Sequence, residues 1–246
     1  MPVSQGVYFY WGFYAHKDSH LAPLCLHFGE GPGVSILIDI FASVGPYKYE
    51  SAQKITENPY AWNKHVNMLF IEAPLGTGLS TRYEKKIKGH AQSFELESEA
   101  IIEFLIKFVE MYPEFGGRDL ILSGESSGTQ ISIPLGYKLL KSTLKKPNLK
   151  LKGLFLNSPC LNVFLQFAYI PQFLYKHKRI TKKRYQEMKL VADLFKQNLQ
   201  PNKQPINFSK YMLKFFYHRN RHSLSVDTIN GVSNLHNFYG DFFERG

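Results

Sequence analysis

Residues 118–135 read RDLILSGESSGTQISIPL, and this stretch decides the fold. A short apolar run is followed by Gly124-Glu125-Ser126-Ser127-Gly128 and then by a segment that can start a helix. Gly-x-Ser-x-Gly between a strand and a helix is the pattern of a nucleophile elbow, a sharp turn that lifts the serine hydroxyl above the sheet. The stretch therefore predicts Ser126 as a nucleophile, and an ordinary Gly/Ser turn is the alternative. Both glycines are expected because strand and helix pass too close for a Cβ.

The composition indicates one large globular domain. The chain has 246 residues, of which 44% are hydrophobic and 15% aromatic, enough for a substantial core. No uninterrupted apolar run approaches the roughly 18 residues of a membrane helix, and the start, MPVSQGVYFYWGFY, lacks the features of a signal peptide. We therefore expect no transmembrane segment, and either a cytoplasmic protein or a mature chain or fragment.

The cysteines and histidines indicate neither a disulfide framework nor a metal site. Cys25 and Cys160 are too few for a disulfide framework, and a buried free thiol is the favoured interpretation of each over a bond between them. The nine histidines are scattered, and no Cys-x-x-Cys or phosphate-binding Walker pattern is present. The sequence predicts no metal and no cofactor.

The charge is unevenly distributed along the chain. Residues 1–137 contain 10 Lys and Arg against 15 Asp and Glu, whereas residues 138–246 contain 20 against 5. Such asymmetry can mark an acidic partner or a membrane surface. Solvated lysine-rich helices are the favoured interpretation, because the basic residues are spread among apolar ones and do not form a tail.

Strand and helix patterns alternate over the first two thirds of the chain. Buried strands are expected at Leu24–Phe28, Asn67–Glu72 and Gly153–Leu156, with an aromatic edge strand or hairpin at residues 7–14. Helices are expected at 35–44 and at 93–112, where apolar residues share one face and Pro113 ends the pattern. This alternation predicts an α/β fold with a mostly parallel sheet and helices on both faces.

Two further segments matter for function. The loop Gly29–Gly33, GEGPG, exposes backbone N–H groups after an early strand, so it is either an oxyanion hole or a plain connection. From residue 162 strand patterns no longer alternate with helical ones. Aromatic and basic residues dominate this segment, and its apolar residues have helical spacing. We therefore divide the chain into an α/β core at 1–161 and a helical cap or insertion at 162–246.

Several blocks of sequence resemble those of one protein family and follow the same order along the chain. They are FYWGFY, GEGPGVS, VGPY, NPYAWNK, NMLFIEAPLGTGLS, MYPEF and LSGESSGTQISIP, between residues 8 and 135, with weaker similarity through KGLFLNSP. The chain resembles the serine carboxypeptidases, α/β-hydrolases that remove C-terminal residues from peptides. The resemblance implies a peptide or protein substrate, no cofactor, and a secretory, lysosomal or vacuolar location.

The resemblance also assigns roles to residues. Ser126 matches the nucleophile, and the Gly31 and Ser127 N–H groups match the oxyanion hole. Glu125 matches a carboxyl that helps to bind the substrate's terminal carboxylate by sharing a proton, which requires a raised pKa. The family's loop places an Asn for this carboxylate where this chain has Gly29, and Glu30 adds a carboxylate next to it.

The base and acid of a catalytic triad are expected in the order Ser, Asp, His. In the family both come from a C-terminal region that this chain does not reach before Gly246. Asp193, Asp227 and Asp241 with His218, His222 and His236 satisfy the order in places, for example Asp227 and His236, but surface or core roles are favoured for them. We therefore expect a truncated or incomplete chain with weak or no peptidase activity.

Two other functions stay open at this point. One is a non-catalytic binding protein that uses the basic second half for an acidic partner, and the other is acyl transfer to an acceptor other than water. Nucleic acid is not an expected partner. The sequence indicates no oligomeric state.

Overall fold

The computed structural model describes residues 1–51, 54–83, 94–141, 147–159 and 161–197. By its internal contacts the chain divides into two compact units, Met1–Leu161 and Asn162–Gly246.

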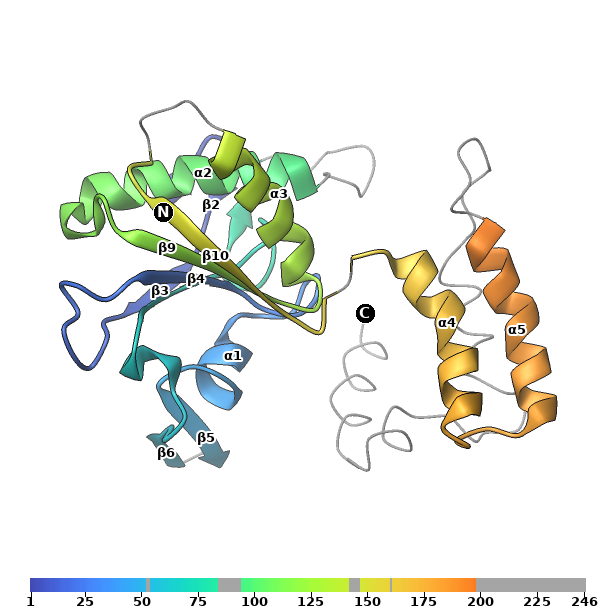
Figure 1. Ribbon diagram of the computed structural model, residues 1–246. Coiled ribbons are helices and arrows are strands. Elements are labelled where there is room, and N and C mark those ends of the chain that lie inside the picture. Colours follow the sequence, from blue (N-terminus) through green and yellow to red (C-terminus); the bar gives the residue numbers. More distant parts are fainter. Residues whose placement is uncertain (52–53, 84–93, 142–146, 160, 198–246) are drawn as a thin grey trace. The chain divides into compact units, whose positions relative to one another are not determined.

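The first unit is built on a five-stranded sheet with the strand order β10-β9-β4-β7-β3 (Figure 1). Four strands pair in parallel: β10 (Lys150–Asn157), β9 (Asp119–Glu125), β4 (Leu24–Phe28) and β7 (Asn67–Ile71). The aromatic β3 (Tyr10–Phe13) runs antiparallel to β7. The predicted mostly parallel sheet is confirmed, and because the strands are parallel their carboxyl ends lie along one edge.

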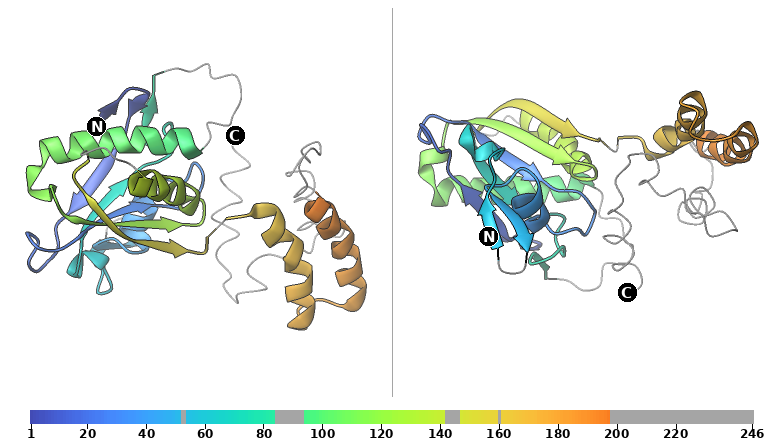
Figure 2. Two further views of the ribbon diagram at one scale, coloured as in Figure 1. Left: turned by 45° about the horizontal axis from the view of Figure 1, so that its top comes forward. Right: turned by 90° about the horizontal axis from the view of Figure 1, so that it is seen from below.

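Helices cover both faces of this sheet. Figures 1 and 2 show α2 (Phe94–Met111) and α3 (Gly128–Lys141) on one face and the short α1 (Leu37–Ala42) on the other. Alternate residues of each strand enter separate cores, since successive side chains of a strand point to opposite faces. Leu24, Leu26 and Phe28 pack in the α2/α3 core, whereas Cys25 packs in the α1 core.

The long helix α2 follows its predicted apolar face. Ile101, Phe104, Leu105 and Phe108 are almost fully buried against the sheet. The helix ends just before the 3₁₀ turn Pro113–Phe115, because proline cannot continue the helical hydrogen bonding. The 18 residues of α2 therefore match the expectation drawn from periodicity.

Short elements complete the first unit. Three two-residue strands, β1 (Pro2–Val3), β2 (Gly6–Val7) and β8 (Thr81–Arg82), form a small sheet. β5 (Tyr47–Ser51) pairs with β6 (Lys54–Glu57) in a two-stranded sheet, and a 3₁₀ turn covers Trp62–Lys64. The sequence patterns did not predict these strands, because β5 is exposed along its whole length and shows no buried face.

The second unit is helical over its described residues. It contains α4 (Val163–Lys176) and α5 (Lys182–Gln197). Asn162 caps α4, its side-chain oxygen accepting the Leu165 N–H at 2.9 Å. The two helices share a small core of apolar residues: Ala168, Leu174, Met188 and Ala192.

Candidate active site

Ser126 occupies a sharp turn at the carboxyl edge of the sheet. It directly follows β9 and precedes α3 by one residue, and its backbone has a φ of +49°. Its N–H donates to the Asn157 carbonyl at 3.0 Å, at the end of the neighbouring β10. A non-glycine residue in the left-handed region stores strain, and such strain concentrates at functional sites. Strand, turn and helix thus have the order that the elbow pattern predicts.

The two elbow glycines are required by close packing, as expected. A Cβ on Gly124 would lie 2.6 Å from Ser132 Oγ and 2.7 Å from the Gly128 carbonyl carbon. A Cβ on Gly128 would lie 2.6 Å from the Gly29 carbonyl oxygen. Since real Cβ atoms do not approach other atoms this closely, any larger residue would push α3 away from β9 or from the Gly29 loop.

The glycine-rich loop after β4 lies next to Ser127, the residue that follows Ser126. Gly31 has a φ of +143°, and a Cβ there would lie 3.5 Å from Ser127 Oγ. The structure therefore brings Gly31 and Ser127 together. Their role as the two donors of an oxyanion hole stays a prediction.

Glu125 lies half-buried immediately before Ser126. Asn157 Nδ2 donates to Glu125 Oε1 at 3.2 Å. Burial, and then the negative charges of Asp39 and Glu30, raise the pKa of the Glu125 carboxyl, while His27 and the Asn157 hydrogen bond act in the opposite direction. A raised pKa is what proton sharing with a substrate carboxylate requires, so the direction agrees with the role that the resemblance assigns.

Sequence reasoning missed Asp39. This residue of α1 is almost fully buried, and a Cβ on Gly29 would lie closer than 3.0 Å to its Oδ2 atom. The Asp39 carboxylate thus takes the space into which a side chain at position 29 would extend. One acidic residue in the otherwise apolar segment Leu37–Ala42 was the available signal.

His27 lies beside Asp39 on the same face of the sheet. Its Nε2 atom is 3.6 Å from Asp39 Oδ2, and its Nδ1 atom is 2.9 Å from Ser123 Oγ. The three residue types are those of a catalytic triad. However, Ser123 is only 1% exposed, so a substrate cannot reach its hydroxyl. We interpret these three side chains as a buried polar network and not as a catalytic triad.

Of the Asp and His residues that satisfy the triad order in the sequence, Asp193 alone lies among the described residues. Asp193 belongs to α5, in the second unit, where its Oδ2 pairs with Lys189 Nζ at 2.8 Å. Asp227, Asp241, His218, His222 and His236 lie outside the described residues. In the part of the chain that the structure describes, Ser126 Oγ forms no hydrogen bond with a histidine.

Comparison with known proteins identifies the family. The family model "Serine carboxypeptidase" matches residues 2–242. The chain belongs to the serine carboxypeptidase family. Serine carboxypeptidase-like 38 of Arabidopsis thaliana is 30% identical over 226 residues, which are 90% of this chain and 45% of that protein. Serine carboxypeptidase S10 family member 1 of Dictyostelium discoideum is 29% identical over 169 residues, covering 69% of this chain and 40% of that protein.

A solved structure shows the same fold. The prohormone-processing carboxypeptidase Kex1(delta)p of Saccharomyces cerevisiae superposes with a TM-score of 0.70 at 20% identity, covering 93% of this chain and 48% of that chain. The α/β-hydrolase fold expected from the sequence is thereby confirmed. This chain spans about half the length of the curated relatives that it matches.

The described residues offer no sign of a bound metal or of a membrane span. They contain no group of three or more His, Cys, Asp and Glu side chains that could hold a metal ion. None of their helices is both long and apolar enough to cross a bilayer. Cys25 is a free, buried thiol, and burial raises its pKa to about 12, as expected for an inert core cysteine.

Proposed function

We propose that this chain is the nucleophile-bearing part of a serine carboxypeptidase, acting on C-terminal peptide bonds through an acyl-enzyme on Ser126. The single observation that carries the proposal is the strained Ser126 between β9 and α3 with the Gly31 loop alongside. Family membership supports the reaction class. Gly29, Glu30 and Glu125 are the proposed surroundings of the substrate's terminal group, and residues 162–246 the proposed cap.

The proposed chemistry begins with attack of Ser126 Oγ on the carbonyl carbon of the last peptide bond. A base removes the hydroxyl proton, and the Gly31 and Ser127 N–H groups hold the negative oxygen of the tetrahedral intermediate. The C–N bond breaks as the proton passes to the departing amine, which leaves an ester on Ser126. Water then attacks the ester carbonyl, gives its proton to the base, and releases the shortened peptide with the serine hydroxyl restored.

The activity that we propose for this polypeptide is limited, because no residue is assigned as the base or as the acid that orients it. Without them, an oxyanion hole and substrate binding retain a rate several orders of magnitude below full catalysis, roughly the 10³–10⁴-fold residual acceleration over water of triad-deleted enzymes. We therefore propose weak or no peptidase activity for the chain as given. A secretory, lysosomal or vacuolar location is proposed from the family alone.

An active-site serine probe tests this proposal. A fluorophosphonate should label the wild-type chain slowly, and Ser126→Ala should abolish the labelling. Ser123→Ala is the matched control, because Ser123 is buried on β9, three residues before Ser126, and should not react. Labelling that survives Ser126→Ala would refute the nucleophile, and fast, stoichiometric labelling of Ser126 would refute the weak-activity part.

The charge asymmetry supports a second candidate function. The 20 basic against 5 acidic residues in 138–246 are the observation that favours a non-catalytic protein that holds an acidic partner. Salt-dependent retention on a polyanion, unchanged in Ser126→Ala, would favour this function. Retention equal to that of a neutral matrix would rule it out.

A further inference from the structure

A buried glutamate joins two loops at the carboxyl edge of the sheet. Glu72 directly follows β7 and has no exposed surface. Its Oε1 atom accepts the Ser35 hydroxyl, and its Oε2 atom accepts the Leu79 N–H at 2.5 Å. Each carboxylate oxygen thus receives one hydrogen bond, one from the segment after β4 and one from the segment after β7. Such charge-assisted bonds are among the stronger ones in proteins.

Ser35 is the end point of the glycine-rich loop. It follows Gly33 and Val34, and its Oγ atom also accepts the Leu37 N–H at 3.3 Å, at the start of α1. The hydroxyl therefore donates to Glu72 while it accepts from the helix. Glu72 fixes the place where the loop ends and α1 begins.

The glycine-rich loop between the end of β4 and Ser35 is short, and its backbone is tightly curled. Its first end follows β4, where Gly128 packs against the Phe28 and Gly29 carbonyls. A Cβ on Gly31 would lie 2.8 Å from Gly33 N and 3.2 Å from Val34 N, so the backbone folds back on itself over these residues. Because only three residues separate Gly31 from Ser35, a displacement of Ser35 moves the Gly31 N–H group.

The segment after β7 leaves space for the Glu72 carboxylate at Gly78. Gly78 has a φ of +50°, and a Cβ there would lie 2.6 Å from Glu72 Oε2 and still closer to Oε1. Only glycine combines this backbone angle with the approach of the carboxylate. Position 78 therefore requires glycine beside the Glu72 carboxylate, which also accepts the hydrogen bonds from Ser35 and Leu79.

We propose that Glu72 is a positioning residue for acyl transfer at Ser126: it clamps Ser35 and thereby sets the Gly31 N–H against the oxygen of the tetrahedral intermediate. The inference rests on the proposed function and extends it beyond the residues that touch substrate. Removing the clamp lowers the rate of the chemical step and leaves binding of the reagent unchanged, since the hole acts on the transition state.

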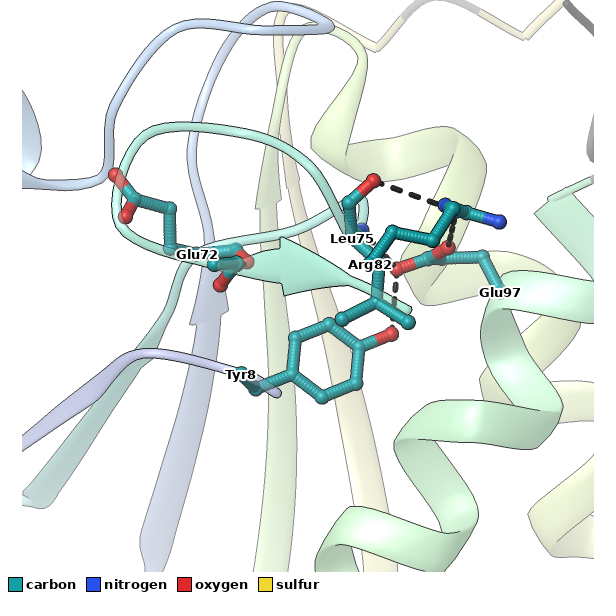
Figure 3. A network of polar contacts seen from close by, with 6 residues as sticks. Tyr8, Glu72, Leu75, Arg82 and Glu97 are labelled. Atoms are coloured by element: carbon teal, nitrogen blue, oxygen red, sulfur yellow. Dashed lines mark hydrogen bonds and ion pairs between the residues drawn. The ribbon is translucent and has the colours of Figure 1, made fainter. Parts of the chain in front are cut away.

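A second buried glutamate provides a matched control. Glu97 is 1% exposed and, like Glu72, accepts one hydroxyl and one backbone N–H: Tyr8 Oη at 2.5 Å and Leu75 N at 2.8 Å. Figure 3 shows Tyr8 and Arg82 converging on the Glu97 carboxylate, apart from Glu72. Both of these bonds go to Glu97 Oε1, whereas Glu72 accepts one on each oxygen, but the same substitution in either glutamate disturbs one hydroxyl bond and one backbone bond.

The experiment compares Glu72→Gln with Glu97→Gln, and Gly78→Ala with Gly76→Ala. Gly76 also has a positive φ, of +98°, but a Cβ there meets no atom within 4 Å. We expect Glu72→Gln and Gly78→Ala to lower the first-order rate of fluorophosphonate labelling at Ser126 by about tenfold or more, with the reagent's half-saturation concentration unchanged. The two controls should remain within about twofold of wild type.

Amide hydrogen exchange supplies a readout that does not depend on reactivity. Exchange across residues 29–35 should accelerate in Glu72→Gln and Gly78→Ala and stay at the wild-type rate in the controls. Equal labelling rates for each variant and its control would overturn the proposal. If wild type is not labelled at all, the proposed acyl-enzyme on Ser126 fails, and unchanged exchange in Glu72→Gln would then overturn the Glu72–Ser35 contact as the support of the loop.

Discussion

The carboxyl edge near Ser126 and the corner formed by Tyr8, Leu75, Arg82 and Glu97 both contain buried carboxylates, and in the corner an arginine faces the carboxylate. Arg82 Nη2 lies 3.7 Å from Glu97 Oε2 and also donates to the Leu75 carbonyl at 3.3 Å (Figure 3). At the edge, Asp39 faces an imidazole, and among the described residues neither Glu72 nor Glu125 forms an ion pair with Lys or Arg.

This difference separates stability from function. In the corner, burial raises the pKa of Glu97, and the hydrogen bonds from Tyr8 and Leu75 and the charge of Arg82 act in the opposite direction. At the edge, burial and then the like charges of Asp39 and Glu30 raise the pKa of Glu125, and no Arg or Lys charge is among the opposing causes. Carboxylates that raise one another's pKa in this way are typical of functional sites. Substitution of Glu97 in the corner should therefore act on stability, whereas substitution of Glu72 or Gly78 at the edge should act on the reactivity of Ser126.

The largest effect is expected in the corner, from Glu97→Ala. The change leaves the Tyr8 hydroxyl and the Leu75 N–H without their acceptor and Arg82 without its counter-charge. Because all of these groups are wholly or partly buried, we expect a loss of about 2–4 kcal/mol in the free energy of unfolding. Urea unfolding measures it, and Glu99→Ala, on the exposed side of α2, is the control. A loss equal to that of the control would contradict the structural role of the corner.

The next effect is at the elbow, from Gly128→Ala. The added methyl group meets the Phe28 and Gly29 carbonyls, so α3 must move away from β4. We expect a loss of about 1–3 kcal/mol by urea unfolding, the usual range for overpacking. Gly153→Ala in β10 should cost far less, because a Cβ there meets nothing within 4 Å. Equal costs at the two positions would show that α3 tolerates the displacement.

Local patterns predicted the sheet and the elbow, but not the contacts around them. Unbroken apolar runs and flanking glycines were sufficient for β4, β7 and β9, and the helical period for α2, because these signals lie within one element. The approach of Asp39 to Gly29 and of Glu72 to Ser35 joins different elements. No periodicity records such contacts, so the clamp and the charges around Glu125 emerged only from the structure.

An intermediate effect is expected from a double-mutant cycle between positions 29 and 39. Gly29→Ala introduces a methyl group into the space of the Asp39 carboxylate, and Asp39→Ala removes that carboxylate. The double variant should therefore be more stable than the sum of the single losses predicts, with a coupling of about 0.5–2 kcal/mol. Thermal or urea unfolding of the four proteins gives the coupling. Strict additivity would mean that the carboxylate moves aside at no cost.

The smallest effect concerns the charge state of Glu125. Burial contributes most to its raised pKa, so Asp39→Asn removes only the second cause, and the pKa should fall part of the way toward the ordinary value of 4.5. Carbon-detected NMR of the Glu125 carboxyl measures the change. Asp119→Asn, at the other end of β9, should leave the titration of Glu125 unchanged.

The same substitution changes how stability depends on pH, and the sign follows from proton binding. Above pH 4.5 and below the raised pKa of Glu125, the folded chain holds a proton that the unfolded chain has released. The contribution of Glu125 to the free energy of unfolding therefore falls as the pH rises through this window. Asp39→Asn narrows the window, so the fall should be shallower than in wild type when unfolding is measured at a series of pH values. A slope equal to that of wild type, together with an unshifted NMR titration, would show that Asp39 does not act on Glu125 and that burial raises this pKa at the edge as it does for Glu97 in the corner.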